Sequence, residues 1–445
     1  SFVCDSSDLT TSDTLTVEGT FSGGTGLHNI NKINANYSTA DLTLSSGITY
    51  LNGGGSSPFS LTSAMSNLSF ASGTLVFNQS DGNQRFEFNK TPGSDAKRMG
   101  TVVFNNGPSN YSYISALGWA DYRVPHDDII ILSNDNSTGF LTQGLDMGMD
   151  GSLKIAADAK INASSSTLTL GENFNMAGGF IGRNALDFNG TDENVTISDS
   201  TSLDDPNTAD LLTLECWITI GDNTPATDVA MIGRDSTYRF YLENGPDTIR
   251  LQVYTDAGGW QTIDSNTLIT SLDQNKWYHL AATWDGSTLK LYIDGKLDAE
   301  ESGSGSMQAS AQDLTLGSYR RTPEMWWDGK MARASVWAVA LTEAEIRSML
   351  FQDWSTMAGA GVIDDSKCVA WYEFNDLIAG TTVSDMSGSG NTGTLSTTDA
   401  WANAGTFTIG TSTVKMVGTG EIKARSTTFY DLHVADATGD VTTVT

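Results

Sequence analysis

The chain has 445 residues, and 53 acidic against 24 basic side chains give it a formal net charge of −29. Such a charge repels nucleic acid and anionic membrane surfaces, so nucleic acid is not an expected partner. No run of about 18 apolar residues occurs, so we expect no membrane span. The 45 glycines, together with abundant Ser, Thr and Asn, indicate an all-β protein with many turns. Its length suggests two or three domains.

Residues 1–178 form a β-rich region in which short apolar runs are separated by Gly, Asn and Ser clusters. The runs at 75–78, 86–89 and 102–105 follow one another at spacings of roughly a dozen residues. Such spacing is typical of a β-sandwich or of a stack of β-coils in a solenoid. We expect this region to be a scaffold through which chains assemble.

Residues 179–402 contain the clearest strand signals. Two apolar runs flank Asp285-Gly286, and Asp294-Gly295 ends the second run. Asp-Gly between alternating apolar segments is a strong hairpin signal, because tight primed turns need positive φ. The pattern predicts an antiparallel sheet with one buried face, formed by Tyr278, Leu280, Ala282, Trp284, Leu289, Leu291 and Ile293.

One helix is predicted, from about Thr342 to Leu350. Thr342 and Glu345 have the spacing of a capping box, in which each side chain accepts a hydrogen bond from the other residue's amide. We expect this helix to close one end of a β-sandwich.

The segments of the central region resemble laminin-G-like, concanavalin A-type jelly-roll modules. The hairpin is similar to the family's late hairpin, and the family's other strands are matched, in its order, by residues 185–190 with 195–197, 214–218, and 327–337 with 341–346. A motif that usually precedes the module is matched after the helix, at 369–374 and 383–395. Either the module is permuted and this segment supplies its edge strands, or a second module begins here. We favour permutation.

Residues 403–445 repeat the texture of the first region and resemble the repeats of long viral fibres and bacterial surface adhesins. The fold expected for the whole chain is therefore all-β. A concanavalin A-like jelly-roll β-sandwich is inserted between repetitive β-strand regions of sandwich or solenoid type.

Exposed aromatic side chains are the candidate carbohydrate-binding residues, because sugar rings stack on aromatic faces. Trp260 follows a Gly-Gly pair, and Trp326-Trp327 lies in a second loop, with Tyr238 and Tyr319 as lesser candidates. Adjacent side chains alternate in a strand, so one of Trp326 and Trp327 is expected in the core.

Calcium is the one cofactor that the resemblance implies. Asp187, Asp192 and Asp328 stand where related modules place oxygen-rich loops, and calcium takes six to eight oxygen ligands. The alternative is that these aspartates form turns beside glycines. The acidic pair that the family usually places after its Gly-Lys is missing, since Met331, Ala332 and Arg333 stand there.

Catalytic motifs are not apparent. Some jelly-roll relatives are glycoside hydrolases with a Glu-x-Asp-x-x-Glu strand, but Glu215 has no carboxylate two residues on. Neither a Gly-x-Ser-x-Gly elbow nor a nucleotide fingerprint is found. Cys216 and Cys368 could form a disulfide, and free buried thiols are the equal alternative.

The function that we expect is a non-enzymatic structural or adhesion protein, outside the cell or on a virion surface. It would be a fibre, filament or decoration subunit that self-assembles through the flanking β regions and displays the jelly-roll. One alternative is a lectin module of a secreted adhesin that binds surface glycans. The other is a polysaccharide-active glycoside hydrolase.

Overall fold

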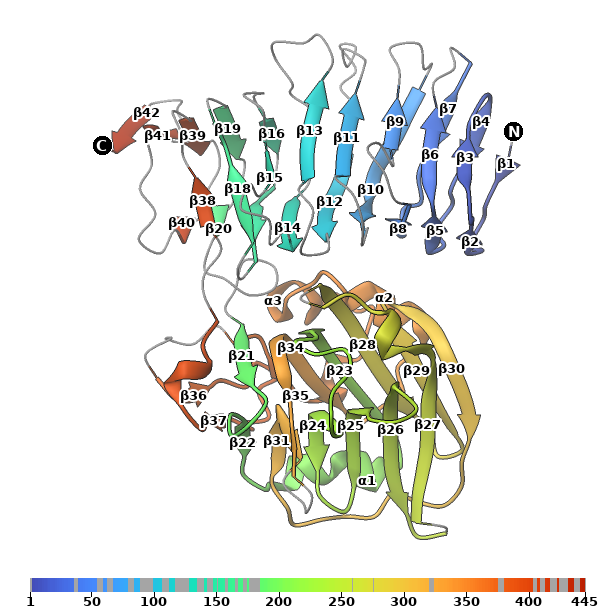
Figure 1. Cartoon of the computed structure of the whole chain (residues 1–445), viewed down its shortest axis with the longest axis vertical. Coiled ribbons are helices and arrows are strands. Elements are labelled where there is room, and N and C mark those ends of the chain that lie inside the picture. Colours follow the sequence, from blue (N-terminus) through green and yellow to red (C-terminus); the bar gives the residue numbers. More distant parts are fainter. Residues whose placement is uncertain are drawn as a thin grey trace. The chain divides into compact units, whose positions relative to one another are not determined.

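The chain forms two compact units in the computed structural model (Figure 1). Unit 1 contains Ser1–Gly182 and Ala404–Thr445, and unit 2 contains Arg183–Asn403. The structure describes residues 2–35, 39–53, 59–61, 67–78, 84–88, 99–105, 112–116, 128–133, 140–141, 147–149, 151–156, 159–164, 167–170, 174–175, 185–257, 259–274, 276–319, 324–374, 380–402, 406–408, 413–416, 422–423, 431–435 and 441–444.

Unit 1 is a stack of β-coils whose strands pair in parallel with those of the next coil. Thr49 of β8 (Ile48–Leu51) pairs with Leu75 of β10 (Asn67–Phe77), and Leu75 pairs with Val102 of β12 (Met99–Asn105). Parallel pairing between successive coils is the pattern of a solenoid. Of the two alternatives that the sequence left open for this region, the structure has the solenoid.

The strands of unit 1 form rows along the stack. The first row, which shares β10 with the second, contains β1 Phe2–Val3, β4 Thr20–Ser22 and β7 Asp41–Thr43. Besides β8, β10 and β12, the second contains β2 Leu9–Thr10, β5 His28–Ile30, β14 Ile129–Ser133, β17 Leu153–Ile155, β20 Phe174–Asn175 and β40 Ile422–Lys423. The third contains β3 Thr14–Thr16, β6 Lys32–Ala35, β9 Phe59–Leu61, β11 Gln84–Phe88, β13 Ser112–Ala116, β15 Phe140–Leu141, β18 Lys160–Asn162 and β38 Thr406–Thr408. A further row contains β16 Met147–Met149, β19 Thr167–Leu170, β39 Thr413–Met416, β41 Asp431–Ala435 and β42 Val441–Val444.

Successive coils place like side chains above one another. The rings of Phe77 and Phe104 stack with centroids 5.0 Å apart and an interplanar angle of 11°. A ladder of side-chain amides runs along the stack, in which each Nδ2 donates to the Oδ1 of the preceding coil, through Asn29, Asn52, Asn78 and Asn105. The ladder joins successive coils through side chains that are exposed or half-buried, apart from the buried Asn105.

The sequence of unit 2 is inserted between two successive strands of one coil of unit 1. β38 continues the third row by pairing with β18, with Phe407 beside Ile161. β40 continues the second row by pairing with β20, with Ile422 beside Phe174. The coil that begins at β20 is therefore completed by β38, more than 200 residues later in the sequence.

Unit 2 is a sandwich of two antiparallel sheets. The first sheet contains β21 Leu186–Asn189, β34 Asp328–Trp337, β23 Leu212–Thr219, β28 Trp277–Trp284, β29 Thr288–Ile293 and β30 Lys296–Ser302, with β35 Cys368–Tyr372 beside β34. The second sheet contains, in spatial order, β27 Gly259–Leu268, β26 Thr248–Thr255, β25 Tyr238–Glu243, β24 Val229–Arg234, β31 Leu314–Leu316, β22 Val195–Ile197, β37 Gly393–Leu395 and β36 Thr382–Val383. Two short strands, β32 Ser318–Tyr319 and β33 Met325–Trp326, pair separately.

The core lies between these sheets. Leu280, Ala282 and Trp284 of β28 are fully buried in one cluster with Phe240 and Leu251 of the second sheet. The β29–β30 hairpin agrees with its Asp-Gly signal, because Asp294 and Gly295 have φ of 51° and 73°, as a two-residue primed turn requires. In the β28–β29 hairpin only Gly286 of the Asp285-Gly286 pair has a positive φ, 89°. The predicted jelly-roll is confirmed, with the predicted side chains of β28 on its core face. The expectation of one buried face was wrong for this sheet, because every residue of β28 is buried and a second apolar cluster, which includes Ala281 and Tyr292, covers the outer side.

The late motif is part of the same sandwich. β35 pairs with β34 in the first sheet, whereas β37 pairs with β22 and β36 with β37 in the second. The segment therefore supplies strands to both sheets, and the permutation alternative is the correct one.

The predicted helix is α2 (Glu343–Met349), and its capping box is present between Thr342 and Glu345. Its position differs from the expectation. Ile346 and Met349 pack with Trp337 and Trp371 on the side of the first sheet that faces away from the core. The helix thus covers a face instead of closing an end. The remaining short helices are α1 Asp205–Ala209, α3 Trp354–Met357, η2 Thr201–Asp204, η3 Ile269–Ser271, η4 Asp365–Lys367 and η5 Thr398–Ala400.

Candidate functional site

The second sheet has a polar face, opposite its core face, that arises from simple alternation. In β25, Phe240 and Leu242 are buried in the core, and the residues between and beside them point the other way. The same holds for β26, where Leu251 and Val253 are in the core. We define the polar face by its residues on β25, β26 and β27: Arg239, Tyr241, Glu243, Arg250, Gln252, Tyr254, Trp260, Thr262 and Asp264.

The centre of the polar face is a row of hydrogen-bonded side chains across three strands. Strand register places Arg239 beside Gln252, and Gln252 beside Thr262. Nε of Arg239 donates to Oε1 of Gln252 at 2.6 Å, and Nε2 of Gln252 donates to the hydroxyl of Thr262 at 2.8 Å. The hydroxyl of Tyr241 also donates to Oε1 of Gln252, at 3.2 Å. The row fixes the amide and guanidinium groups in place.

Three aromatic rings surround the guanidinium of Arg239. Its Cζ lies 4.9 Å from the ring centroid of Tyr241, 5.0 Å from that of Trp260 and 5.4 Å from that of Tyr319. Trp260 also meets the ring of Tyr254 at 5.1 Å, with an interplanar angle of 67°. Arg239 and Trp260 are only half-buried, so this cationic and aromatic cluster reaches solvent.

Tyr319 reaches the cluster from another part of the sequence. It lies on β32, and its ring packs over Gly233 of β24, where a Cβ atom would come within 2.6 Å of the ring. The absence of a side chain at Gly233 therefore makes room for Tyr319. Its hydroxyl donates to Oδ1 of Asp235 at 2.9 Å, which holds the ring beside Arg239.

A second arginine on the polar face is fully paired. Arg250 bonds Asp264 through Nε at 2.7 Å and through Nη2 at 2.8 Å, and its Nη1 lies 2.7 Å from Glu243. Burial opposes the charge of Asp264, but the hydrogen bonds from Arg250 and Thr248 hold the pKa of this carboxyl below its ordinary value. The carboxylates of Asp264 and Glu243 are both ion-paired with Arg250. Neither could act as a general acid unless its ion pair with Arg250 were broken.

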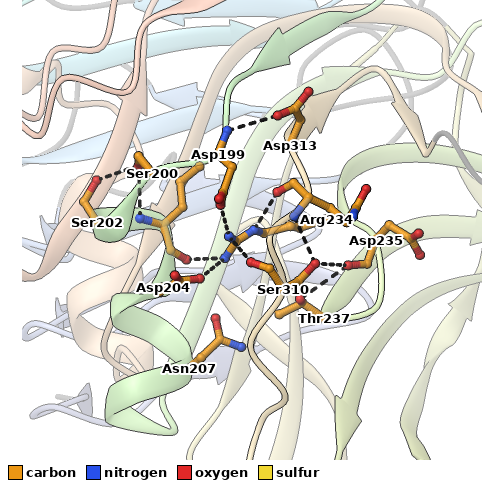
Figure 2. A network of polar contacts seen from close by, with 12 residues as sticks. Asp199, Ser200, Ser202, Asp204, Asn207, Arg234, Asp235, Thr237, Ser310 and Asp313 are labelled. Atoms are coloured by element: carbon orange, nitrogen blue, oxygen red, sulfur yellow. Dashed lines mark hydrogen bonds and ion pairs between the residues drawn. The ribbon is translucent and has the colours of Figure 1, made fainter.

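Arg234, at the end of β24, is also saturated by protein groups (Figure 2). Its buried guanidinium contacts the carboxylate oxygens of Asp199 and Asp204 at 2.6 and 2.9 Å. It also donates to three carbonyl oxygens, those of Leu203, Ser310 and Gln312. This network ties the loops at one end of the second sheet together and leaves no place for an external anion.

The predicted carbohydrate-binding residues do not all lie together at one site. Trp260 and Tyr319 lie together at Arg239. Tyr238 shares the core face with Phe240 and is fully buried, so its ring is out of reach of a ligand. Trp326 is half-buried on β33, and Trp327 is fully buried, as expected for one member of this pair.

Three residues of this cluster, Arg239, Gln252 and Tyr254, were not among the candidates predicted from the sequence. The alternation of residue types along β25 and β26 could have identified them. Ile, Leu, Val and Phe lie on the core face of each strand, so the residues between them must lie on the polar face. Which of these residues lies beside Tyr319 depends on how the strands are arranged in the fold, and a single sequence does not reveal that arrangement.

The candidate calcium ligands lie near the start of unit 2. Asp187 and Asp328 are on the paired strands β21 and β34, and burial, with the nearby carboxylates Asp222 and Asp187, raises the pKa of Asp328. Asp187 also lies 3.4 Å from Nζ of Lys330, and Asp192 accepts a hydrogen bond from Asn189 in a turn. Among the described residues, no group of three or more His, Cys, Asp or Glu is arranged to hold a metal ion. Calcium stays a prediction.

Glu215 occupies a buried position on the first sheet, under α2. Its carboxylate accepts hydrogen bonds from Arg333, His279 and Ser335. Burial opposes ionisation, but Arg333 and His279 lower the pKa of Glu215 to about 2. A buried carboxylate with this pKa is unsuited to act as a general acid, so Glu215 gives the hydrolase alternative no support.

The three cysteines are buried thiols. The Sγ of Cys216 lies 3.8 Å from Met231 Sδ, and that of Cys368 lies 3.4 Å from the carbonyl oxygen of Ala370. Of the two alternatives, the free thiols are the ones present, and the disulfide is not formed.

Comparison with known families places unit 2 among the lectin-like jelly-rolls. Residues 189–347 match a laminin-G family model described as the concanavalin A-like lectin/glucanases superfamily. The fold and this match together define unit 2 as a concanavalin A-like domain. A search of curated proteins finds no match.

Several solved structures resemble part of the chain. A candidate carbohydrate-binding protein from Bacteroides ovatus is 19% identical with a TM-score of 0.37, and the match covers 48% of this chain and 58% of that one. The SAP-like pentraxin of Limulus polyphemus is 14% identical with a TM-score of 0.29, covering 38% and 81%. The CBM40 of the Ruminococcus gnavus IT-sialidase, solved with α2,3-sialyllactose, is 14% identical with a TM-score of 0.29, covering 37% and 97%.

In the described part of the chain, no helix is both long and apolar enough to cross a lipid bilayer.

Proposed function

We propose that unit 2 is a carbohydrate-binding module and that the polar face of its second sheet is the binding surface. The observation that carries this proposal is the cluster of Trp260, Arg239 and Tyr254 beside the fixed amide of Gln252. An aromatic ring that reaches solvent offers a surface for the apolar side of a pyranose. The amide and the Thr262 hydroxyl offer hydrogen bonds to its hydroxyl groups.

The opposite side of the sandwich is unsuited to this role. There α2 and α3 cover the first sheet, where Ile346, Met349 and Met357 pack against Trp371. The half-buried aromatic residue Trp354 on this side packs on that apolar cluster, whereas Trp260 on the second sheet lies beside the guanidinium of Arg239.

Unit 1 supports a structural role for the whole protein. We propose that it is the scaffold of an extracellular or virion-surface structural or adhesion protein, such as a fibre, filament or decoration subunit, which displays unit 2. The support is the stacked parallel coils, together with the entry of unit 2 between β20 and β38 of one coil. We propose further that chains associate through unit 1.

The binding proposal is tested on a glycan array with the full-length chain. Trp260→Ala removes the ring and is expected to abolish the array signals, whereas Trp260→Phe keeps a ring and is expected to retain part of them. Trp401→Ala is the matched control, because Trp401 is also half-buried but bonds Gly380 near the other end of the sheet. Signals that survive Trp260→Ala at full strength would remove the polar face from the proposal.

The assembly proposal is tested separately, by sedimentation and negative-stain imaging of the purified chain. Fibres, or closed oligomers joined through unit 1, would support it. A monomer at micromolar concentration would contradict self-assembly and leave the binding proposal intact.

A further inference from the structure

Arg239 differs from the other described arginines of unit 2 in its electrostatic partners. Arg234, Arg250, Arg333 and Arg347 each contact at least one carboxylate oxygen within 2.9 Å. Within the described part of the chain, Arg239 has no such ion pair, and its hydrogen bond is to a neutral amide, Oε1 of Gln252. In a chain with a net charge of −29, an arginine without an acidic partner is unusual.

The row of amides uses one donor of Arg239, its Nε. A guanidinium carries five N–H donors in one plane, and the bond to Gln252 uses Nε, so the four donors on the two Nη atoms are not used in that bond. Rings of Tyr241, Trp260 and Tyr319 around Cζ restrict the group to one orientation. An arginine held in this way is prepared for a planar, two-oxygen anion at little entropic cost.

We propose that the site selects acidic sugars, and that Arg239 binds the carboxylate of a uronic or sialic acid residue while Trp260 contacts a pyranose ring. This inference rests on the proposed function and specifies its ligand class. The 5.0 Å between Cζ of Arg239 and the ring of Trp260 places both contacts within reach of one or two adjacent sugar residues.

The overall acidity of the chain does not prevent this recognition. Repulsion between the ligand and distant carboxylates is screened beyond about 8 Å at 0.15 M ionic strength. The nearest acidic groups on the polar face, Glu243 and Asp264, are neutralised in part by Arg250. Asp235, beside Tyr319, is a further acidic group near the cluster, and its carboxylate accepts a hydrogen bond from the Tyr319 hydroxyl.

The test uses the full-length chain and pairs of oligosaccharides that differ in charge, with affinities measured by calorimetry at 0.15 M salt. Hexagalacturonate is paired with its neutral methyl ester, and 3′-sialyllactose with neutral lactose. A heparin hexasaccharide is compared with its desulfated form, which keeps its carboxylates, to test for recognition of sulfate. We expect a carboxylate-bearing member to bind about tenfold or more tighter than its neutral partner, because hydrogen bonds to a charged group contribute more than neutral ones.

Arg239→Met keeps an unbranched side chain among the rings but removes the charge and the donors. It is expected to abolish the preference for the acidic partner, so that this variant binds the acidic and the neutral partner with affinities within about twofold of each other. Lys296→Met, on exposed β30 of the first sheet, is the control for loss of one positive charge. Thermal unfolding of each variant verifies that the fold is retained.

The outcomes separate the two proposals. Equal binding of charged and neutral partners, or a preference that persists in Arg239→Met, would overturn the acidic-sugar inference. If Trp260→Ala still abolished that binding, the carbohydrate-binding proposal would stand. A preference for the sulfated member alone would overturn the assignment to a carboxylate, and no binding to any member would overturn both proposals.

Discussion

Arg333 and Glu215 form a buried ion pair between neighbouring strands of the first sheet, with Nη2 and Oε1 2.5 Å apart. The other terminal nitrogen of Arg333 donates to the carbonyl oxygens of Met349 and Gln352, at and just after the end of α2. The pair therefore joins β23, β34 and the end of the helix. Cations at a helix C-terminus also interact favourably with the helix dipole.

Replacement of Arg333 tests this connection. Arg333→Met leaves the Glu215 carboxylate buried without its cation and is expected to lower the free energy of unfolding of unit 2 by about 3–5 kcal/mol. Urea unfolding followed by tryptophan fluorescence reports on unit 2, since Trp119 is the one tryptophan outside it. A double variant with Glu215→Gln should recover part of the loss. A loss below about 1 kcal/mol in the single variant would contradict the account.

Stability near neutral pH tests the protonation state of His279. Burial lowers the pKa of His279 from its ordinary 6.5, so the native ring is neutral and donates from Nε2 to Glu215. Below pH 6.5 the unfolded chain binds a proton that the native ring does not, so the contribution of His279 to the free energy of unfolding should fall as pH drops. Glu215 adds no change above pH 5, because it is ionised in both states there.

The matched variant for this experiment is His279→Gln, which cannot titrate but can still donate to Glu215. Its stability should fall less between pH 7 and pH 5 than that of the natural chain. Burial raises the pKa of Asp294 to about 6, which stabilises the native state as pH falls, but this contribution is common to both proteins. Parallel pH profiles would contradict a neutral buried His279.

The asparagine ladder predicts a local effect in unit 1. Asn78→Ala removes the side-chain bonds to Asn52 and Asn105 and should cost about 1–3 kcal/mol, at roughly 0.5–1.5 kcal/mol per bond. Hydrogen exchange at residues 73–78 and 99–105 is the readout, since repeat units are stabilised by their neighbours. Asn29→Ala, which removes one described ladder bond, should have about half the effect. Equal exchange in all three proteins would show that the ladder is not stabilising.

The cysteines predict slow alkylation of the native chain. Burial raises the pKa of Cys216 and Cys368 well above the ordinary value of a thiol, and the thiolate is the reactive form. Iodoacetamide should label both residues rapidly only after unfolding in urea, with no reductant needed. A Cys216–Cys368 disulfide in a peptide map of the non-reduced protein would contradict the structure.

The sequence was sufficient for features that depend on local patterns. Leu280, Ala282 and Trp284 are in the core because alternation alone assigns them to one face. The capping box at Thr342 and Glu345 follows from their spacing of three residues. The family resemblance was also readable, because its motifs lie in continuous segments.

Features that depend on distant contacts were not readable. Nothing in the sequence near Tyr319 shows that its ring lies over Gly233 and beside Arg239. β24 and β25 are consecutive strands, but β32 is distant from both in the sequence and meets them only in the fold. The position of α2 was wrong for the same reason, because Trp337 and Trp371 make their apolar surface on the outer side of the first sheet. Tyr238 was a different error, since its alternation with Phe240 already indicated the core.

The most direct test of the central claim is a crystal structure of the full-length chain with the tightest oligosaccharide from the binding panel. The account predicts a sugar ring against Trp260, within hydrogen-bond distance of the Arg239, Gln252 and Thr262 row. A sugar bound anywhere else on unit 2, or on unit 1, would contradict it.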